Sequence, residues 1–322
     1  MTYFARRLLH GMLVLVGASI LSFLFLELAP GEFFSDMQMN PQISPQTLAA
    51  LRGQYGLDQP LPIRYVRWLR SAARGDWGYS FAYNLPVSQL IWGRARNTLA
   101  LTVSAALLAW SIAIPLGIFA AEKQHRWGDR IAGAASSALL ATPDLLLALA
   151  LLVFAIRTHA FPVGGMVSLD YAVSGTGGKI KDVIAHFSLP VAALVLAMLP
   201  VLFRHVRAGM LEALALPSIQ AARGHGIPRH RILFRYALPA AANPLVSLLG
   251  LSIATLLSSS LLVEVIMSWP GLGPMLLEAI LARDLYLVIG AVMLSTLFLV
   301  AGNFIADVLL YWVDPRIRRG TA

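Results

Sequence analysis

The stretch Pro217-Ser-Ile-Gln-Ala-Ala-Arg-Gly-His-Gly226-Ile-Pro-Arg-His-Arg231, followed by Ile-Leu-Phe-Arg-Tyr-Ala-Leu238-Pro239, decides how this chain is organised. It is the most polar and basic internal stretch of a sequence that is otherwise mostly apolar, and long apolar segments flank it on both sides. A polar stretch between two apolar segments has to emerge into water. A soluble partner is therefore expected to meet the chain here.

Prolines and glycines divide this stretch into short pieces. Pro217 suits a first helical turn, where its missing N–H costs nothing. Gly224 and Gly226 provide the backbone freedom that ends a helix, and Pro228 can begin the next one. The sequence therefore predicts a short helix over 217–224, a turn, and a second helix that leads back into an apolar segment.

Composition identifies the class of protein. Hydrophobic residues make up 58% of the 322 residues and charged residues 13%, and the mean hydropathy is +0.71, which is too apolar for a soluble globular protein. Each apolar window is long enough to cross about 30 Å of hydrocarbon at 1.5 Å per residue. We predict an all-α polytopic membrane protein with six transmembrane helices. The windows are 8–26, 97–121, 131–156, 183–203, 236–263 and 285–306.

The windows also suggest four regions. The expected regions are a first transmembrane helix at 1–29, an external loop with amphipathic helices at 30–96, a five-helix core at 97–316 that contains the loop 204–235, and a basic tail at 317–322. Lys and Arg choose the orientation, because they concentrate on the cytoplasmic side of membrane proteins. Fourteen of them lie in the segments on one side and four in the short loops opposite. Both termini and the loop 204–235 are therefore expected in the cytoplasm, with the chain in the bacterial inner membrane.

The stretch also resembles a known motif. Gln220-Ala221-Ala222, three residues, Gly226, eleven residues and Leu238-Pro239 resemble the EAA loop of ABC importer permeases, whose pattern is Glu-Ala-Ala, three residues, Gly and a later Ile-x-Leu-Pro. Gln220 stands in place of the Glu and Tyr236 in place of the Ile. Further segments are similar to the oligopeptide, dipeptide and nickel branch of the family: Leu57-Asp-Gln-Pro-Leu-Pro62, Arg74-Gly-Asp-Trp-Gly78, Val263-Glu264 with Trp269-Pro-Gly-Leu-Gly273, Arg283-Asp284, and Asp314-Pro-Arg-Ile-Arg318.

The resemblance implies a permease subunit rather than an enzyme. It implies a second related permease, two cytoplasmic ATPases that carry ATP and Mg, an external solute-binding protein, and no cofactor in this chain. ATP binding would move the ATPases and the loop docked on them, and the adjoining helices would then switch access to the path. The residues that the resemblance assigns to ATPase coupling are Ser218, Gln220, Ala221, Ala222, Arg223, Gly224, Gly226, Leu238 and Pro239.

The external loop shows helical patterns of its own. Ser44-Pro45 can start a helix that runs to about Tyr55, and residues 57–62 read as a turn. From 63 to 73, apolar Ile63, Val66, Leu69 and Ala73 share one face and arginines fall on another, which is typical of an amphipathic helix. Such a helix either lies on the outer headgroups or helps to receive the binding protein.

Two sets of polar residues inside apolar windows are candidates for the translocation path. Pro143 kinks a helix, and the carboxylate of Asp144 follows it near mid-membrane. Asp144 can line a path, form a structural hydrogen bond to another helix, or lie nearer the surface than expected. Ser252, Thr255 and Ser259 form a polar stripe at helical spacing, which favours helix packing over path lining.

Several other functions find little support in the sequence. The basic residues sort by membrane side and do not interleave with aromatics, which argues against nucleic-acid binding. Zero cysteines exclude thiolate metal sites, and the seven histidines form no metal-binding pair motif. The stretch Gly175-Thr-Gly-Gly-Lys179 lacks the spacing of a phosphate-binding loop. The alternatives left open are import of nickel chelates or other small solutes in place of di- or oligopeptides, and an ion-coupled secondary transporter.

Overall fold

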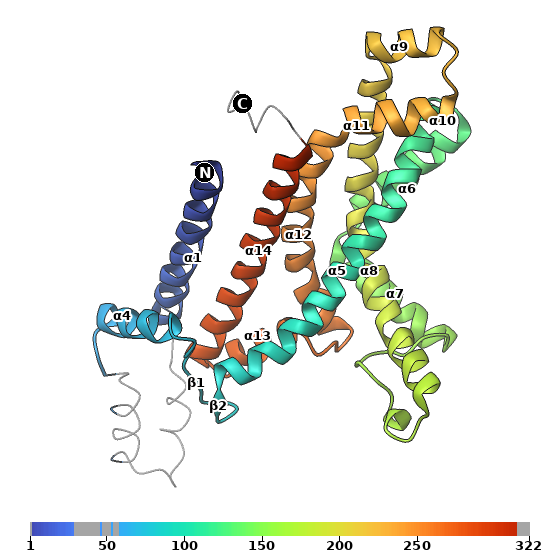
Figure 1. The fold of residues 1–322 in the computed structure, drawn as a ribbon. Helices are drawn as coiled ribbons and strands as arrows, with labels where there is room; N and C mark the ends of the chain where they lie inside the picture. Colours follow the sequence, from blue (N-terminus) through green and yellow to red (C-terminus); the bar gives the residue numbers. More distant parts are fainter. Residues whose placement is uncertain (1, 29–45, 47–52, 54–57, 314–322) are drawn as a thin grey trace. The chain divides into compact units, whose positions relative to one another are not determined.

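The computed structural model describes residues 2–28, 46, 53 and 58–313. The part of the chain so described is almost entirely helical, as the sequence predicts (Figure 1). Its elements are α1 (Thr2–Leu28), α4 (Leu61–Ala72), β1 (Tyr79–Ser80), β2 (Leu85–Pro86), α5 (Val87–Glu122), α6 (Trp127–Ala141), α7 (Asp144–Thr158), a 3-10 turn (Leu169–Tyr171), α8 (Thr176–Leu214), α9 (Pro217–Gly224), α10 (Arg229–Arg231), a π-helical turn (Ile232–Ala237), α11 (Leu238–Ala240), α12 (Ala242–Ile266), α13 (Leu272–Leu281) and α14 (Leu285–Val313). The helix predicted from Ser44 to Tyr55 lies almost wholly outside the described residues.

Among the described residues, five helices are long and apolar enough to cross a membrane, with mean hydropathies of 2.0 to 2.3 over their most apolar windows. They are α1, α5, α8, α12 and α14. Four of them, α1, α5, α8 and α14, each contain one predicted window, whereas the window 236–263 begins in the π-helical turn and continues through α11 into α12. The predicted window over 131–156 instead falls on two helices, α6 and α7, which are bent by 101° where they meet.

The break between α6 and α7 follows from Pro143. The residue before a proline is pushed out of the helical region, and Thr142 is accordingly extended, with φ −97° and ψ 119°. Pro143 is extended as well, with ψ 143°, and its carbonyl accepts hydrogen bonds from Leu146 and Leu147 as α7 begins. The sequence predicts a kinked single helix here, whereas the structure has two separate helices.

Contacts show that α6 and α7 together traverse the bundle. Near the start of α6, Asp129 pairs with Arg207, which lies close to the end of α8 that leads into α9. Beyond α7, Gly165 donates a hydrogen bond to the carbonyl of Met267. Met267 follows the C-terminal end of α12, which is the end far from α9. The chain therefore passes from one side to the other, and the pair counts as one broken span. With it, the described residues contain six spans.

The chain forms two compact units, residues 1–98 with 270–300 and residues 99–269 with 301–322. In the first unit, α4 lies across one end of α1 (Figure 1). Trp68 of α4 is buried against Phe23 of α1 and Ile289 of α14. The predicted apolar face of α4 is exposed. Two of its residues, Ile63 and Val66, are 52% and 44% accessible.

A short hairpin closes the first unit. Asp284 is fully buried, and its Oδ2 accepts hydrogen bonds from the Ser80 hydroxyl at 2.6 Å and from the Ala82 amide at 3.0 Å. These bonds fasten the hairpin of β1 and β2 to the corner before α14. Beside them, the Tyr83 hydroxyl donates to the carboxylate of Glu278. Burial and this hydrogen bond both raise the pKa of Tyr83, so its phenol stays protonated as a donor.

The second unit is built around α8, which packs against α6, α7 and α12. Small residues let the helices approach closely. A Cβ at Gly117 of α5 would lie 2.6 Å from Val206 of α8, and one at Gly302 of α14 would lie 2.5 Å from Ile253 of α12. Close contact through glycines is typical of helix packing in membranes, where the hydrophobic effect contributes little to helix association.

Candidate functional site

The loop between α8 and α12 folds into the predicted short helix, turn and second helix (Figure 1). Pro217 occupies the first turn of α9, after an extended Leu216. Gly226 has φ +75°, in the left-handed region that favours glycine, and it turns the chain after α9. Gly224 is the last residue of α9 and has no positive φ. The turn therefore needs Gly226, while Gly224 only ends the helix.

The helix after the turn contains an irregularity that Pro239 explains. Pro228 caps α10, and the chain then widens into a π-helical turn before α11. Proline has no N–H to donate, and its ring displaces the carbonyl four residues earlier. A widened turn just before Pro239 accommodates both effects. Leu238 packs against the apolar cluster beneath the loop, whereas Pro239 is exposed.

One face of α9 is fixed to the membrane helices and the other is free. Ile219 is buried in a cluster with Val206 and Met210 of α8, and Ala222 is buried as well. Ser218, Ala221 and Arg223 are exposed, as are the glycines that follow. The buried face of α9 therefore packs against α8, and its opposite face is exposed.

Gln220 of α9 is also tied to α8. Its Nε2 donates a hydrogen bond of 2.8 Å to the carbonyl of Leu214 in the last turn of α8. The final carbonyls of a helix lack intrahelical donors, and the side-chain amide satisfies one of them. A glutamate in this position has no hydrogen to donate when ionised. Gln220, which differs from the Glu of the motif, thus makes a hydrogen bond that an ionised glutamate could not make.

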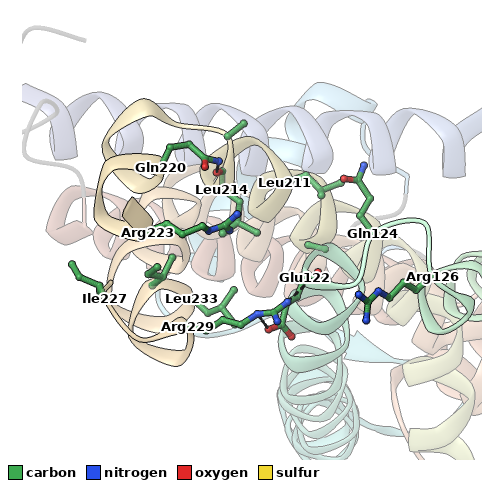
Figure 2. Close-up of a pocket in the computed structure, with 13 residues that line it drawn as sticks. Glu122, Gln124, Arg126, Leu211, Leu214, Gln220, Arg223, Ile227, Arg229 and Leu233 are labelled. Carbon is green, nitrogen blue, oxygen red and sulfur yellow. Dashed lines mark hydrogen bonds and ion pairs between the residues drawn. The ribbon is translucent and has the colours of Figure 1, made fainter. Parts of the chain in front are cut away.

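A groove of about 710 Å³ opens beside α9 (Figure 2). Its walls come from the end of α5, the turn before α6, the end of α8, α9, and the segment after α9. The lining residues are Ala121, Glu122, Gln124, Arg126, Leu211, Leu214, Ala215, Gln220, Arg223, Ile227, Arg229, Ile232 and Leu233. The loop and the membrane helices therefore share one concave surface, and three arginines line it.

Two ion pairs hold the turn between α5 and α6. The Glu122 carboxylate at the end of α5 pairs with Arg229 after α9 (Figure 2). Asp129 accepts two hydrogen bonds from the Arg207 guanidinium, at 2.6 and 2.8 Å, and a third at 2.9 Å from the amide of His125. The first pair joins α5 to the loop, and the second joins α6 to α8. Sequence reasoning missed both, because the partners lie 107 and 78 residues apart.

Two of the candidate path residues contact each other, and two others form hydrogen bonds only within their own helix. Ser259 of α12 donates a hydrogen bond of 2.6 Å to Asp144 Oδ2 at the start of α7. Ser252 is buried and donates to Leu248 in its own helix, and exposed Thr255 donates to Leu251 in the same way. The structure thus brings Asp144 and Ser259 together, and it does not bring Ser252 or Thr255 to them. Pro143 is exposed at the break.

The described residues contain no group of three or more His, Asp or Glu side chains arranged to hold a metal ion. Three pairs of polar side chains in the second unit, Asp129 with Arg207, Glu122 with Arg229 and Asp144 with Ser259, join separate elements.

Comparison with known proteins identifies the family of the chain. Residues 113–319 match the family described as binding-protein-dependent transport system inner membrane component, and residues 1–102 match its N-terminal family. The chain is 35% identical over 317 residues to the oligopeptide transport system permease protein AppB of Bacillus subtilis, covering 98% of each chain. It is 32% identical over 320 residues to the dipeptide transport system permease protein DppB of Escherichia coli K12, covering 94% of each.

A solved structure shares the fold. It is an inward-facing conformation of the MetNI methionine ABC transporter, with a TM-score of 0.53 and 19% identity, covering 70% of this chain and 97% of that one. The helical bundle, the projecting loop and the matches along the whole sequence agree. This chain therefore belongs to the family of inner membrane components of binding-protein-dependent transport systems.

Proposed function

We propose that this chain is a permease subunit of an ATP-driven importer that moves di- or oligopeptides from an external binding protein to the cytoplasm. The observation that carries the proposal is the match to peptide permeases over nearly the full length, at 98% coverage for AppB and 94% for DppB. A third relative, the probable D,D-dipeptide permease DdpB of Escherichia coli K12, is 32% identical over 323 residues. All three names place peptides as cargo of the relatives.

The proposed machine has further subunits. A second, related permease completes the path, two cytoplasmic ATPases bind ATP and Mg, and an external binding protein delivers the peptide. This chain hydrolyses nothing. It spans the inner membrane with both termini and the loop 204–235 in the cytoplasm, where the ATPases can reach α9.

Coupling in this proposal runs through α9. Closure of the ATPase pair on ATP displaces α9, and Ile219 passes that displacement to α8 through its buried contacts. The ion pair between Glu122 and Arg229 carries it to α5. Two arrangements of the helices then alternate, one open to each side, with ATP binding biasing the population. The coupling residues are Ser218, Gln220, Ala221, Ala222, Arg223, Gly224 and Gly226, with Leu238 and Pro239 in the returning helix.

The proposed path passes the break between α6 and α7. Asp144 is partly exposed there and offers a carboxylate to a passing amino group. Ser259 holds that carboxylate in place. Ser252 and Thr255 lie on α12, the helix of Ser259, nearer to its cytoplasmic end. This arrangement favours a flexible polar chain with a free amine over a bare cation, since the chain has no cysteine and the described residues contain no group of three or more His, Asp or Glu side chains arranged to hold a metal ion.

Uptake into proteoliposomes tests the proposal. The complete complex, with its binding protein and ATPases, should accumulate radiolabelled di- and tripeptides when ATP is supplied, and a non-hydrolysable analogue should support no accumulation. Collapse of ion gradients by ionophores should leave uptake unchanged. Uptake of nickel-histidine without peptide would change the cargo, and uptake driven by an ion gradient without ATP would identify a secondary transporter.

A further inference from the structure

The loop that carries α9 has an unusual charge. Between Glu212 and Glu264 the sequence contains no Asp or Glu, although four arginines occur in the same interval. Gln220 removes the negative charge that the related motif would place on α9. From Ala213 to Arg235 the loop therefore carries arginines and no acidic side chain, and cationic surfaces associate best with acidic ones.

The groove beside α9 concentrates this charge. Arg126 lines it from the turn before α6, Arg223 from α9, and Arg229 from the segment after α9. Glu122 is the only acidic residue in its lining, and it is already paired with Arg229. Within the described part of the chain, the guanidinium groups of Arg126 and Arg223 have no ion-pair or hydrogen-bond partner. Two unengaged cations thus line one concave surface.

We propose that this groove receives an acidic segment of the partner ATPase, with its carboxylates held by Arg126 and Arg223. The proposal rests on the proposed function, in which the ATPase contacts α9. Arg223 and Gln220 belong both to α9 and to the groove, so a protein that covers α9 also covers this opening. Guanidinium groups bind carboxylates through paired hydrogen bonds, which fixes orientation as well as charge.

The position of the groove favours a protein over a lipid as its occupant. The apolar window of α8 ends at Phe203, and charged residues begin at Arg204. Ala215, which lines the groove, lies twelve residues further, or about 18 Å at 1.5 Å per residue. The headgroup layer on one side of a bilayer is only about 5–8 Å deep. The far wall of the groove therefore stands in the cytoplasm, where a soluble subunit can reach it.

Binding of the ATPase to the permease tests this assignment without measuring transport. The permease pair is immobilised through a tag on this chain, purified ATPase is added, and the apparent dissociation constant is measured between 0.05 and 0.5 M NaCl. The combined change Arg126→Gln with Arg223→Gln should raise that constant about tenfold at low salt, since charge pairs at interfaces steer and hold the partner. It should also flatten the salt dependence, because screening then has fewer pairs to act on.

Arg235→Gln provides a control for the loss of one charge from the same loop. Arg235 lies on the same loop and is exposed, but it does not line the groove, so its removal should change binding less than twofold. Equal weakening by the control and the groove variants would reduce the effect to general charge and overturn the assignment. Unchanged binding by a groove variant that elutes like the unmodified permease would overturn it as well.

Chemical modification of a single cysteine provides a second test if the double variant is not produced as folded protein. The chain has no cysteine, so Gln124→Cys introduces a single thiol in the groove of the folded protein. A sulfonate-bearing thiosulfonate reagent attached there should compete with the acidic segment and weaken ATPase binding more than a neutral reagent of equal length does. Equal effects of the two reagents would contradict a charge-selective groove.

The remaining outcomes separate the two proposals. If the groove variants alter co-purification of anionic lipid and leave ATPase binding intact, the occupant is a lipid headgroup and the assignment fails. If the unmodified permease binds no ATPase at all, the proposed function itself fails. If ATPase binds through the arginines and the complex imports no peptide, only the cargo is wrong.

Discussion

Ser259 of α12 donates a hydrogen bond of 2.6 Å to the carboxylate of Asp144 in the first turn of α7. The contact joins the two sides of the second unit at the point where Pro143 separates α6 from α7. A carboxylate in the first turn also suits the positive end of a helix. Asp144 therefore combines a local role in starting α7 with a contact between helices.

Two substitutions separate the charge of Asp144 from its hydrogen bond. Asp144→Asn keeps an oxygen that accepts from Ser259 and removes the charge, so uptake of peptides with free amino termini should slow more than uptake of N-acetylated peptides. Ser259→Ala keeps the charge and removes the bond, so it should lower stability by about 1 kcal/mol and slow both peptides equally. Competition uptake assays and thermal unfolding measure the two effects. Equal loss of both peptides in Asp144→Asn would make Asp144 a structural residue.

The ion pair between Asp129 and Arg207 should contribute strongly to stability. Asp129 is 5% exposed and accepts three hydrogen bonds, so Asp129→Asn leaves the Arg207 guanidinium without its charge partner. We expect a loss of roughly 2–3 kcal/mol. Arg207→Lys should lose most of the same energy, because an ammonium group cannot form the paired contact. Thermal unfolding of the purified protein measures this, with Glu212→Gln on the exposed surface of α8 as the control.

Gly226 and its neighbour Gly224 form a matched pair. Gly226→Val places a branched side chain at φ +75°, which costs about 1–3 kcal/mol in backbone strain, although nothing lies within 4 Å of its Cβ position. Gly224→Ala is helical and equally open, so it should be neutral or slightly stabilising. Insertion should be normal in both, and peptide uptake with stimulated ATP hydrolysis should fall only in Gly226→Val. Normal uptake in that variant would mean that the turn does not transmit the displacement.

Gln220 should resist replacement by the residue that the related motif carries. Gln220→Glu removes the hydrogen that binds the Leu214 carbonyl and sets a carboxylate against that oxygen. We expect about 0.5–1.5 kcal/mol of local destabilisation and weaker coupling of ATP hydrolysis to uptake. Hydrogen exchange of the α9 amides checks the local effect. Gln220→Met, which removes the bond without adding charge, should show the same local loosening.

The predicted orientation can be checked by labelling, since the chain has no cysteine. Single cysteines at Ser71 and Ser168 should react with an impermeant maleimide added to intact cells, and one at Ser218 should react only after the membrane is opened. Ser168 and Ser218 are both exposed, so accessibility within the protein does not explain a difference. External labelling at Ser218 would overturn the orientation and the coupling proposal together.

Some of the site was readable from the sequence. Pro217, Gly226 and Pro228 act on their own backbone, and this is why the short helix, the turn and the second helix appear where the pattern predicts them. Pairings across the bundle were not readable in this way. Glu122 finds Arg229, and Asp129 finds Arg207, only after α5, α6 and α8 have come together.

The sequence alone determined the class of protein and its spans, because the cost of burying charge in hydrocarbon is paid residue by residue and needs no partner. It also marked Pro143, but the strength of the break depends on packing. A lone proline permits a kink, whereas here α6 and α7 are bent by 101°, with α6 packed against α8 and α7 packed against α8 and α12. The tertiary structure likewise decided which hydroxyl meets Asp144 and how Gln220 is used. A polar side chain can satisfy itself within its helix or across to another, and only the packed neighbours decide between the two.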